Sequence, residues 1–167
     1  LKYVYSSSSS AAKNEELTVI GTNALKDAVS GAYSTVIGAD AMLTSSNPQK
    51  VVAVGASSFR NGTHYSSVAV GYWCAPTISS EQCVFIGDSA GYRNVQGNVL
   101  SGKITNAIAI GYGARINGSN EIQLGGSGQT LYAPTAVNIR SDARDKTDIA
   151  PLDIGLDFVK KLRPVTG

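Results

Sequence analysis

The chain is poor in the residues that build a large apolar core or a densely charged surface. Aromatic residues make up 7% of its 167 residues and charged residues 16%, with one methionine, one tryptophan and one histidine. The net charge of +2 is too small to indicate binding to nucleic acid or to an anionic membrane. No apolar run approaches the roughly 18 residues of a membrane-spanning helix, and no signal peptide is visible. We expect the chain, which begins at Leu1, to be a piece of a longer protein.

Two cysteines and one histidine are too few to complete a zinc site. Cys74 and Cys83 can be read as a disulfide or as half of a metal site, but each also has a regular place in the repeat described below. We therefore expect two free thiols, no metal and no cofactor. We expect His64, next to Tyr65, to be a turn residue without chemistry.

Glycine, in contrast, is abundant, with 18 residues, and seven of them end a repeated phrase. The phrase is a β-branched residue, a variable residue, an aliphatic residue and glycine, as in Val68-Ala69-Val70-Gly71. The phrase glycines are Gly21, Gly38, Gly55, Gly71, Gly87, Gly111 and Gly125. They are spaced by 17, 17, 16, 16, 24 and 14 residues, and a period of this length indicates a repeat architecture.

The columns of the repeat predict how each coil folds. The β-branched and aliphatic residues before each glycine alternate with a period of two, which is typical of a strand, and we expect them to face the inside of the coil. The third residue after each phrase glycine is small, which predicts that the next stretch of the coil passes close by. Coils this narrow bury little apolar surface within one chain. The sequence therefore predicts an all-β fold, a parallel β-roll or β-helical solenoid of seven coils, packed as a homotrimeric fibre.

Composition divides the chain into three segments. Residues 1–17, with five serines in a row, are expected to be a linker or the end of a preceding segment, and residues 18–140 hold the solenoid. Residues 141–167 carry 10 of the 26 charged residues. They predict a short amphipathic helix at 153–162, capped by Asp153 and stopped by Pro164. We interpret this last segment as the start of another domain.

One interval of the repeat is longer than the others. Between Gly87 and Gly111 the surplus lies at 91–103. Insertions in solenoids form loops on one face that often bind ligands, and a surface bulge or an extra hairpin is the alternative. Aromatic rings are further candidates for contact with sugars, although they can also cover the roll or fill the seam between chains. The receptor-binding candidates are Tyr72, Trp73, Tyr92, Arg93 and Asn94.

The junction after residue 140 carries a more specific signal. The phrases SDARDKTDI at 141–149 and LDFVKKLRPV at 156–165 closely resemble the opening of the chaperone-of-endosialidase domain. That domain is the C-terminal intramolecular chaperone of phage tail spikes and tail fibres. The repeats resemble, more loosely, the left-handed parallel β-roll of trimeric adhesin heads.

The resemblance implies a bacteriophage virion protein, the distal part of a tail fibre or tail spike, assembled in the cytoplasm of the bacterial host. Its function would be adhesion, that is, host receptor binding. Its partners would be two further copies of the chain, other virion tail proteins, and a bacterial surface glycan or outer-membrane receptor, with no nucleic acid.

The resemblance also implies one maturation step. The family's chaperone is released by self-cleavage before its first serine, which places the cut between Arg140 and Ser141. Ser141 would attack the preceding carbonyl in an N-to-O acyl shift, and Lys146 would assist proton transfer. This is single-turnover autoproteolysis, and nothing in the sequence indicates a turnover enzyme.

Two other functions stay open at this point. A tail spike that depolymerises capsular polysaccharide would usually need paired carboxylates. The acids of the repeats form no repeated pair, and they are Asp27, Asp40, Glu81, Asp88 and Glu121. A bacterial trimeric adhesin would also match the roll, but it would normally continue into a coiled-coil stalk and a membrane anchor.

Overall fold

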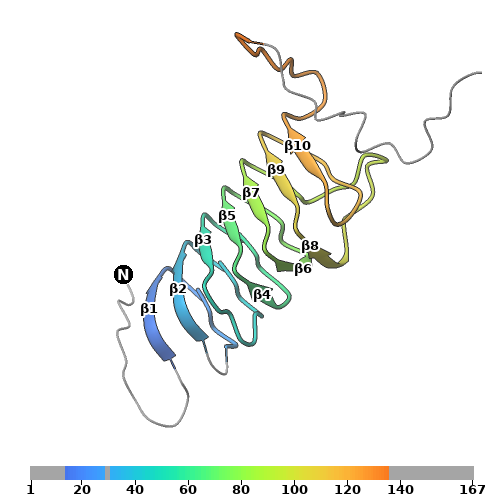
Figure 1. Ribbon diagram of the computed structural model, residues 1–167. Helices are drawn as coiled ribbons and strands as arrows, with labels where there is room; N and C mark the ends of the chain where they lie inside the picture. The colour runs from blue at the N-terminus through green and yellow to red at the C-terminus, as the bar shows by residue number, and fades with distance from the viewer. Residues whose placement is uncertain (1–13, 29–30, 136–167) are drawn as a thin grey trace, which may run out of the picture. The chain divides into compact units, whose positions relative to one another are not determined.

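The computed structural model describes residues 14–28 and 31–135 (Figure 1). The chain divides into two compact units, Leu1–Leu131 and Tyr132–Gly167, and every strand of the described residues lies in the first unit. The helix predicted at 153–162 lies outside the described residues, as do Arg140, Ser141 and Lys146.

Ten short strands form two parallel sheets along the solenoid. The long sheet consists of β1 (Asn14–Ile20), β2 (Gly31–Ile37), β3 (Val52–Val54), β5 (Val68–Val70), β7 (Val84–Ile86), β9 (Ile108–Ile110) and β10 (Ile122–Leu124). The short sheet consists of β4 (His64–Tyr65), β6 (Ile78–Glu81) and β8 (Gly102–Thr105). Figure 1 shows the long sheet stacked in chain order, from blue β1 to orange β10. The described residues contain no helix, so the predicted all-β solenoid is confirmed.

The repeat spacing is the pairing register of the long sheet. Residues immediately before the phrase glycines are partners on neighbouring strands, as Val54 is of Val70 and Val70 is of Ile86. The phrase glycines continue the ladder, because the amide of Gly71 donates to the carbonyl of Val54 and the amide of Gly87 to that of Val70, both at 2.8 Å. The sheet has seven strands. The solenoid therefore has six turns between them, one fewer than the seven coils that we expected.

The strand residues alternate as predicted, but the predicted faces are wrong. The residue two positions before the phrase glycine points inward, and it is fully buried as Val36, Ala53, Ala69, Phe85 and Ala109. The residues one and three positions before each phrase glycine point outward, and we call them the aliphatic stripe. The most exposed of them, between 36% and 69%, are Ile20, Val52, Ile86, Ile110, Ile122 and Leu124. Small residues occupy the inside because the coil is narrow. The β-branched residues point outward, and from there they still stabilise the strand through their preference for extended backbone.

The phrase glycines are required by backbone conformation and by space. At Gly71 φ is +141°, a value that L side chains rarely adopt, and an added Cβ would collide with the carbonyl of Gly87. Gly55 stands in the same relation to Gly71, and Gly38 to Gly55. At these turns the backbones of neighbouring coils are in direct contact, so there is no room for a side chain.

Non-glycine residues also adopt left-handed backbone at regular places. In the coil of Gly55 these are Lys50, Ser57 and Phe59, with φ of 56°, 57° and 46°. The same positions, five before and two and four after the phrase glycine, are left-handed in the coils of Gly38 and Gly71. Such residues cost of order 1 kcal/mol each, so the packing of the coils must maintain them. The residue pattern alone did not reveal this regularity.

The core combines a column of small residues with larger aliphatic side chains and a few rings. The small residue three positions after the phrase glycine is fully buried in five coils, which confirms its predicted place, as Ala41, Ser58, Cys74, Ala90 and Ala114. The inward residue of β7 is Phe85, whereas the inward residues of the neighbouring strands are small. Phe85 packs edge-on against Phe59, with centroids 6.0 Å apart. The Phe85 ring fits because residue 91 is a glycine, and a Cβ added at Gly91 would collide with the ring.

Candidate functional site

The insertion at 91–103 forms an antiparallel hairpin and then re-enters the solenoid. The amide of Leu100 donates to the carbonyl of Tyr92 at 2.9 Å, and the amide of Asn94 donates to that of Asn98 at 2.8 Å. The side chain of Asn94 accepts in turn from the Asn98 amide at 2.9 Å. β8 follows and pairs with β6. The extra hairpin, one of the two alternatives for this insertion, is therefore present, and Asn94 shapes it.

The other four receptor-binding candidates lie together. The rings of Tyr72 and Trp73 have centroids 6.2 Å apart, and Trp73 meets Tyr92 edge-on at 5.5 Å. The guanidinium of Arg93 lies 4.9 Å from the centroid of Tyr92, within the range of a cation–π contact. These residues were separate candidates in the sequence, and the fold joins them into one aromatic surface with a cation at its edge.

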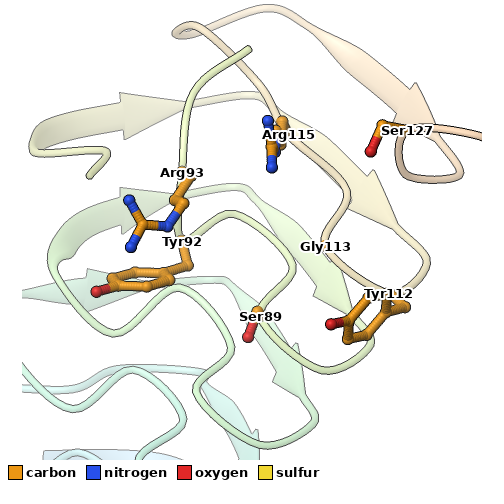
Figure 2. Close-up of a pocket in the computed structure, with 7 residues that line it drawn as sticks. All are labelled: Ser89, Tyr92, Arg93, Tyr112, Gly113, Arg115 and Ser127. Carbon is orange, nitrogen blue, oxygen red and sulfur yellow. The ribbon is translucent and has the colours of Figure 1, made fainter. Parts of the chain in front are cut away.

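A pocket adjoins this surface, because Tyr92 and Arg93 belong to both. It encloses about 250 Å³ and is lined by residues that follow three neighbouring strands of the long sheet (Figure 2). Ser89, Tyr92 and Arg93 follow β7, Tyr112, Gly113 and Arg115 follow β9, and Ser127 follows β10. We call it the Arg93–Arg115 pocket. All of its lining residues lie in the first unit of the chain.

The pocket offers positive charge, hydroxyl groups and aromatic faces. Arg93 is exposed and Tyr112 is 71% exposed, so a ligand from solvent can reach both. The hydroxyl of Ser89 donates to Oδ1 of Asp88 at 2.6 Å, which places one carboxylate beside the lining. This combination of positive charge, hydroxyl groups and rings is suited to binding a polar ligand.

Arg115 and Ser127, which follow β9 and β10, were not expected from the sequence, although Arg115 carries a sequence signal. Arg115 stands four positions after its phrase glycine. In the preceding coils this position is apolar or small, as Leu25, Met42, Phe59, Ala75 and Gly91. A charged residue in a column of core residues marks the place where the coil departs from the repeat. Ser89 and Ser127 had no comparable signal.

Three acidic side chains of the solenoid form ion pairs or hydrogen bonds with neighbouring residues. Glu81 forms an ion pair with Lys103 at 2.7 Å, and Glu121 accepts from the amide of Asn117 at 2.8 Å. Asp40 accepts from the side chain of Asn23 at 3.0 Å, on the neighbouring coil. These three carboxylates do not pair with one another, so the structure gives no support to the capsule-depolymerising enzyme considered above.

Both cysteines are free and buried, as predicted. Burial raises the pKa of Cys74 to about 12 and also raises the pKa of Cys83, so neither thiol forms a reactive thiolate near neutral pH. Among residues 14–28 and 31–135, no three side chains of the metal-binding types gather into a cluster. Within the same ranges no helix is long and apolar enough to cross a membrane.

His64 is not the turn residue that we expected. It begins β4, is fully buried, and stacks on Phe59 with ring centroids 4.1 Å apart. Its Nε2 lies 3.1 Å from the carbonyl oxygen of Asn61, which can only accept, so Nε2 carries the proton. Nδ1 then accepts from the hydroxyl of Ser80 at 2.9 Å. Burial lowers the pKa of His64 to about 4.

Comparison with known families bears on the end of the chain. The described fold is a parallel β-solenoid, and the family model of the chaperone of endosialidase matches residues 141–166, beyond it. This match confirms the resemblance stated for the phrases at 141–149 and 156–165. No curated protein and no solved structure shows significant similarity to the chain.

Proposed function

We propose that this chain is the structural and host-attachment part of a homotrimeric bacteriophage tail fibre or tail spike. The observation that carries the proposal is the succession, within one chain, of a parallel β-solenoid and a segment that matches the chaperone of endosialidase. By its resemblance to that family, the segment assists three solenoids to align and fold together. The protein would then be a virion tail appendage that is assembled in the host cytoplasm and contacts other tail proteins.

The aliphatic stripe supports association of several copies. Its residues on β1, β3, β7, β9 and β10 include aliphatic side chains that expose more than a third of their surface in one chain, and those on β2 and β5 are partly exposed. Apolar side chains exposed along one face of a sheet are typical of an interaction surface. Burial of the stripe between copies would remove this exposed apolar surface from water.

The chaperone segment would be released by the chain itself. The hydroxyl oxygen of Ser141 attacks the carbonyl carbon of Arg140, the bond between that carbon and the Ser141 nitrogen breaks, and the nitrogen takes up a proton. Lys146 assists this proton transfer. Water then hydrolyses the resulting ester, which leaves a carboxylate on Arg140 and restores the Ser141 hydroxyl. This proposal rests on the family resemblance, since these residues lie outside the described ranges.

Light scattering of the purified full-length product tests the trimer. We expect three times the mass of one chain. In the double variant Ile86→Lys/Ile110→Lys we expect dissociation, because two ammonium groups per chain would be buried in the seam without partners. The control is Val95→Lys in the hairpin, a residue that is 55% exposed and off the stripe. A monomeric wild-type protein, or a double variant as trimeric as the control, would contradict the proposal.

The same proteins test attachment. Labelled wild-type protein should adsorb to at least one strain in a panel of encapsulated and uncapsulated bacteria, and the dissociated variant should adsorb less because it has lost multivalent contact. A stable trimer that binds no strain would leave a structural fibre and remove the attachment role.

A further inference from the structure

The Arg93–Arg115 pocket is the strongest candidate for a ligand site that the fold itself does not require. It is built by three successive turns of the solenoid, so its lining residues are held by the coil-to-coil hydrogen bonds. The amide of Gly113, for example, donates to the carbonyl of Asp88 at 2.9 Å. A pocket on such a rigid scaffold is preformed and loses little conformational entropy on binding.

Two guanidinium groups set the charge of the pocket. Arg93 is oriented, because its Nη1 donates to the carbonyl of Gly97 at 2.7 Å and its plane lies over Tyr92. Within the described residues neither Arg93 nor Arg115 forms an ion pair with a carboxylate. A guanidinium stays charged and presents paired donors that match a carboxylate. Asp88, the acid beside the lining, is engaged by the Ser89 hydroxyl.

The remaining lining has both apolar and hydroxyl character. Tyr112 supplies an exposed ring, the Arg93 guanidinium lies over the ring of Tyr92, and Ser89 and Ser127 supply hydroxyl groups. A pyranose ring presents both kinds of surface, an apolar face of C–H groups and a rim of hydroxyls. The volume of about 250 Å³ is below the roughly 300 to 1,000 Å³ of sites for drug-sized ligands. One sugar unit fits this size better than a larger ligand.

We propose that the Arg93–Arg115 pocket binds one carboxylate-bearing sugar unit of a bacterial surface polysaccharide. The carboxylate is held by Arg115 and Arg93, and the sugar ring lies against Tyr112. The aromatic surface of Tyr72 and Trp73 extends from Tyr92 and carries the neighbouring unit of the glycan. The inference rests on the attachment function proposed above and names the chemistry that the attachment recognises.

Fluorescence titration of the full-length protein tests the site. Trp73 is the only tryptophan of the chain, and its ring is 5.5 Å from that of Tyr92, so its emission reports on the site. The probes are trigalacturonate and a hyaluronan tetrasaccharide, with a neutral galactose trimer and inorganic phosphate for comparison. We expect both acidic probes to bind at least about tenfold more tightly than the neutral trimer, as charge-assisted hydrogen bonds predict.

Variants assign the binding to the pocket. Arg115→Ala should weaken the acidic probes by about tenfold or more, and Arg115→Lys should weaken them less. The control is Lys50→Ala, which also removes one positive charge from the solenoid, because Lys50 lies 5.7 Å from the centroid of the Tyr65 ring and outside the pocket. The affinity of Lys50→Ala for the acidic probes should equal that of the wild type.

Several outcomes would overturn the inference. They are absence of binding by both acidic probes, equal binding of the neutral trimer, or equal affinity of Arg115→Ala and Lys50→Ala. Phosphate that binds with the same dependence on Arg115, while the sugars do not bind, would show a simple anion site and reject the saccharide. Each of these results is compatible with an intact trimer that adsorbs to cells, so the attachment proposal is judged separately.

Discussion

At the scale of single residues, the phrase glycines are the positions with the least tolerance for change. From Gly21 to Gly111 they combine positive φ with direct contact between backbones of neighbouring coils, as at Gly71 against Gly87. Gly62 shares both features, since its φ is +108° and an added Cβ would collide with the carbonyl of Ile78. Gly102 has φ of +88° in open space, and Gly118 lies in open space without a positive φ in that range.

Alanine substitution separates the two causes. Gly71→Ala should lower the free energy of unfolding by roughly 2 to 4 kcal/mol, since the backbone strain and the collision add. Gly102→Ala should cost about 1 to 2 kcal/mol through strain alone. Gly118→Ala should be neutral or slightly stabilising. Urea unfolding at one protein concentration measures all three, and equal midpoints for Gly71→Ala and Gly118→Ala would show that the coils do not approach as described.

The buried His64 makes stability depend on pH. The unfolded chain binds the proton near the ordinary pKa of 6.5, whereas the folded chain binds it only near pH 4. Between these values unfolding takes up a proton, so the stability that is present above about pH 7 is lost as the pH falls towards 4. The shift corresponds to roughly 3 kcal/mol at most.

His64→Gln tests this pH dependence. The variant should be less stable than the wild type at pH 7.5, because the stack on Phe59 is altered. The difference between the two proteins should then shrink by up to roughly 3 kcal/mol on acidification to pH 4. Subtracting the stability of the variant from that of the wild type at each pH removes the contribution of the carboxylates that both proteins share. Parallel stability curves from urea unfolding at several pH values would refute a buried, neutral His64.

At the scale of the strand, the sequence determined the period and the register but not the faces. The phrase spacing predicted every pairing of the long sheet, including the pair Ile86 and Ile110 across the insertion. The usual rule that apolar residues point inward failed at residues such as Ile110, 37% exposed, beside the fully buried Ala109. The rule assumes one core per chain, and here the width of the coil selects small inner residues.

The hairpin and the pocket were only partly predictable. The surplus length at 91–103 and its aromatic residues drew attention to Tyr92 and Arg93, but Tyr112 and Ser127 come from later turns. Their approach depends on how the coils stack over β7, β9 and β10, which spacing alone does not state. Arg115 could have been found as a charged break in an apolar column.

At the scale of the whole molecule, the proposed maturation step would separate the solenoid from the residues that follow Arg140. Intact mass of the full-length expressed product should include a species that ends at Arg140. Ser141→Ala should abolish this species, because no hydroxyl is left to attack, and Lys146→Ala should slow its formation. Ser127→Ala, a serine outside the proposed reaction, is the control. Equal cleavage in Ser141→Ala and the control would assign the cut to a separate protease.

The stacked register of the phrase glycines makes each coil an interchangeable module. A duplication of one 16-residue interval, such as that from Gly55 to Gly71, would restore the same contacts at both of its boundaries. It would extend the stack by one strand spacing, about 4.8 Å. Recombination between coils can therefore change the length of the solenoid in equal steps, without any change to the turns that form the Arg93–Arg115 pocket.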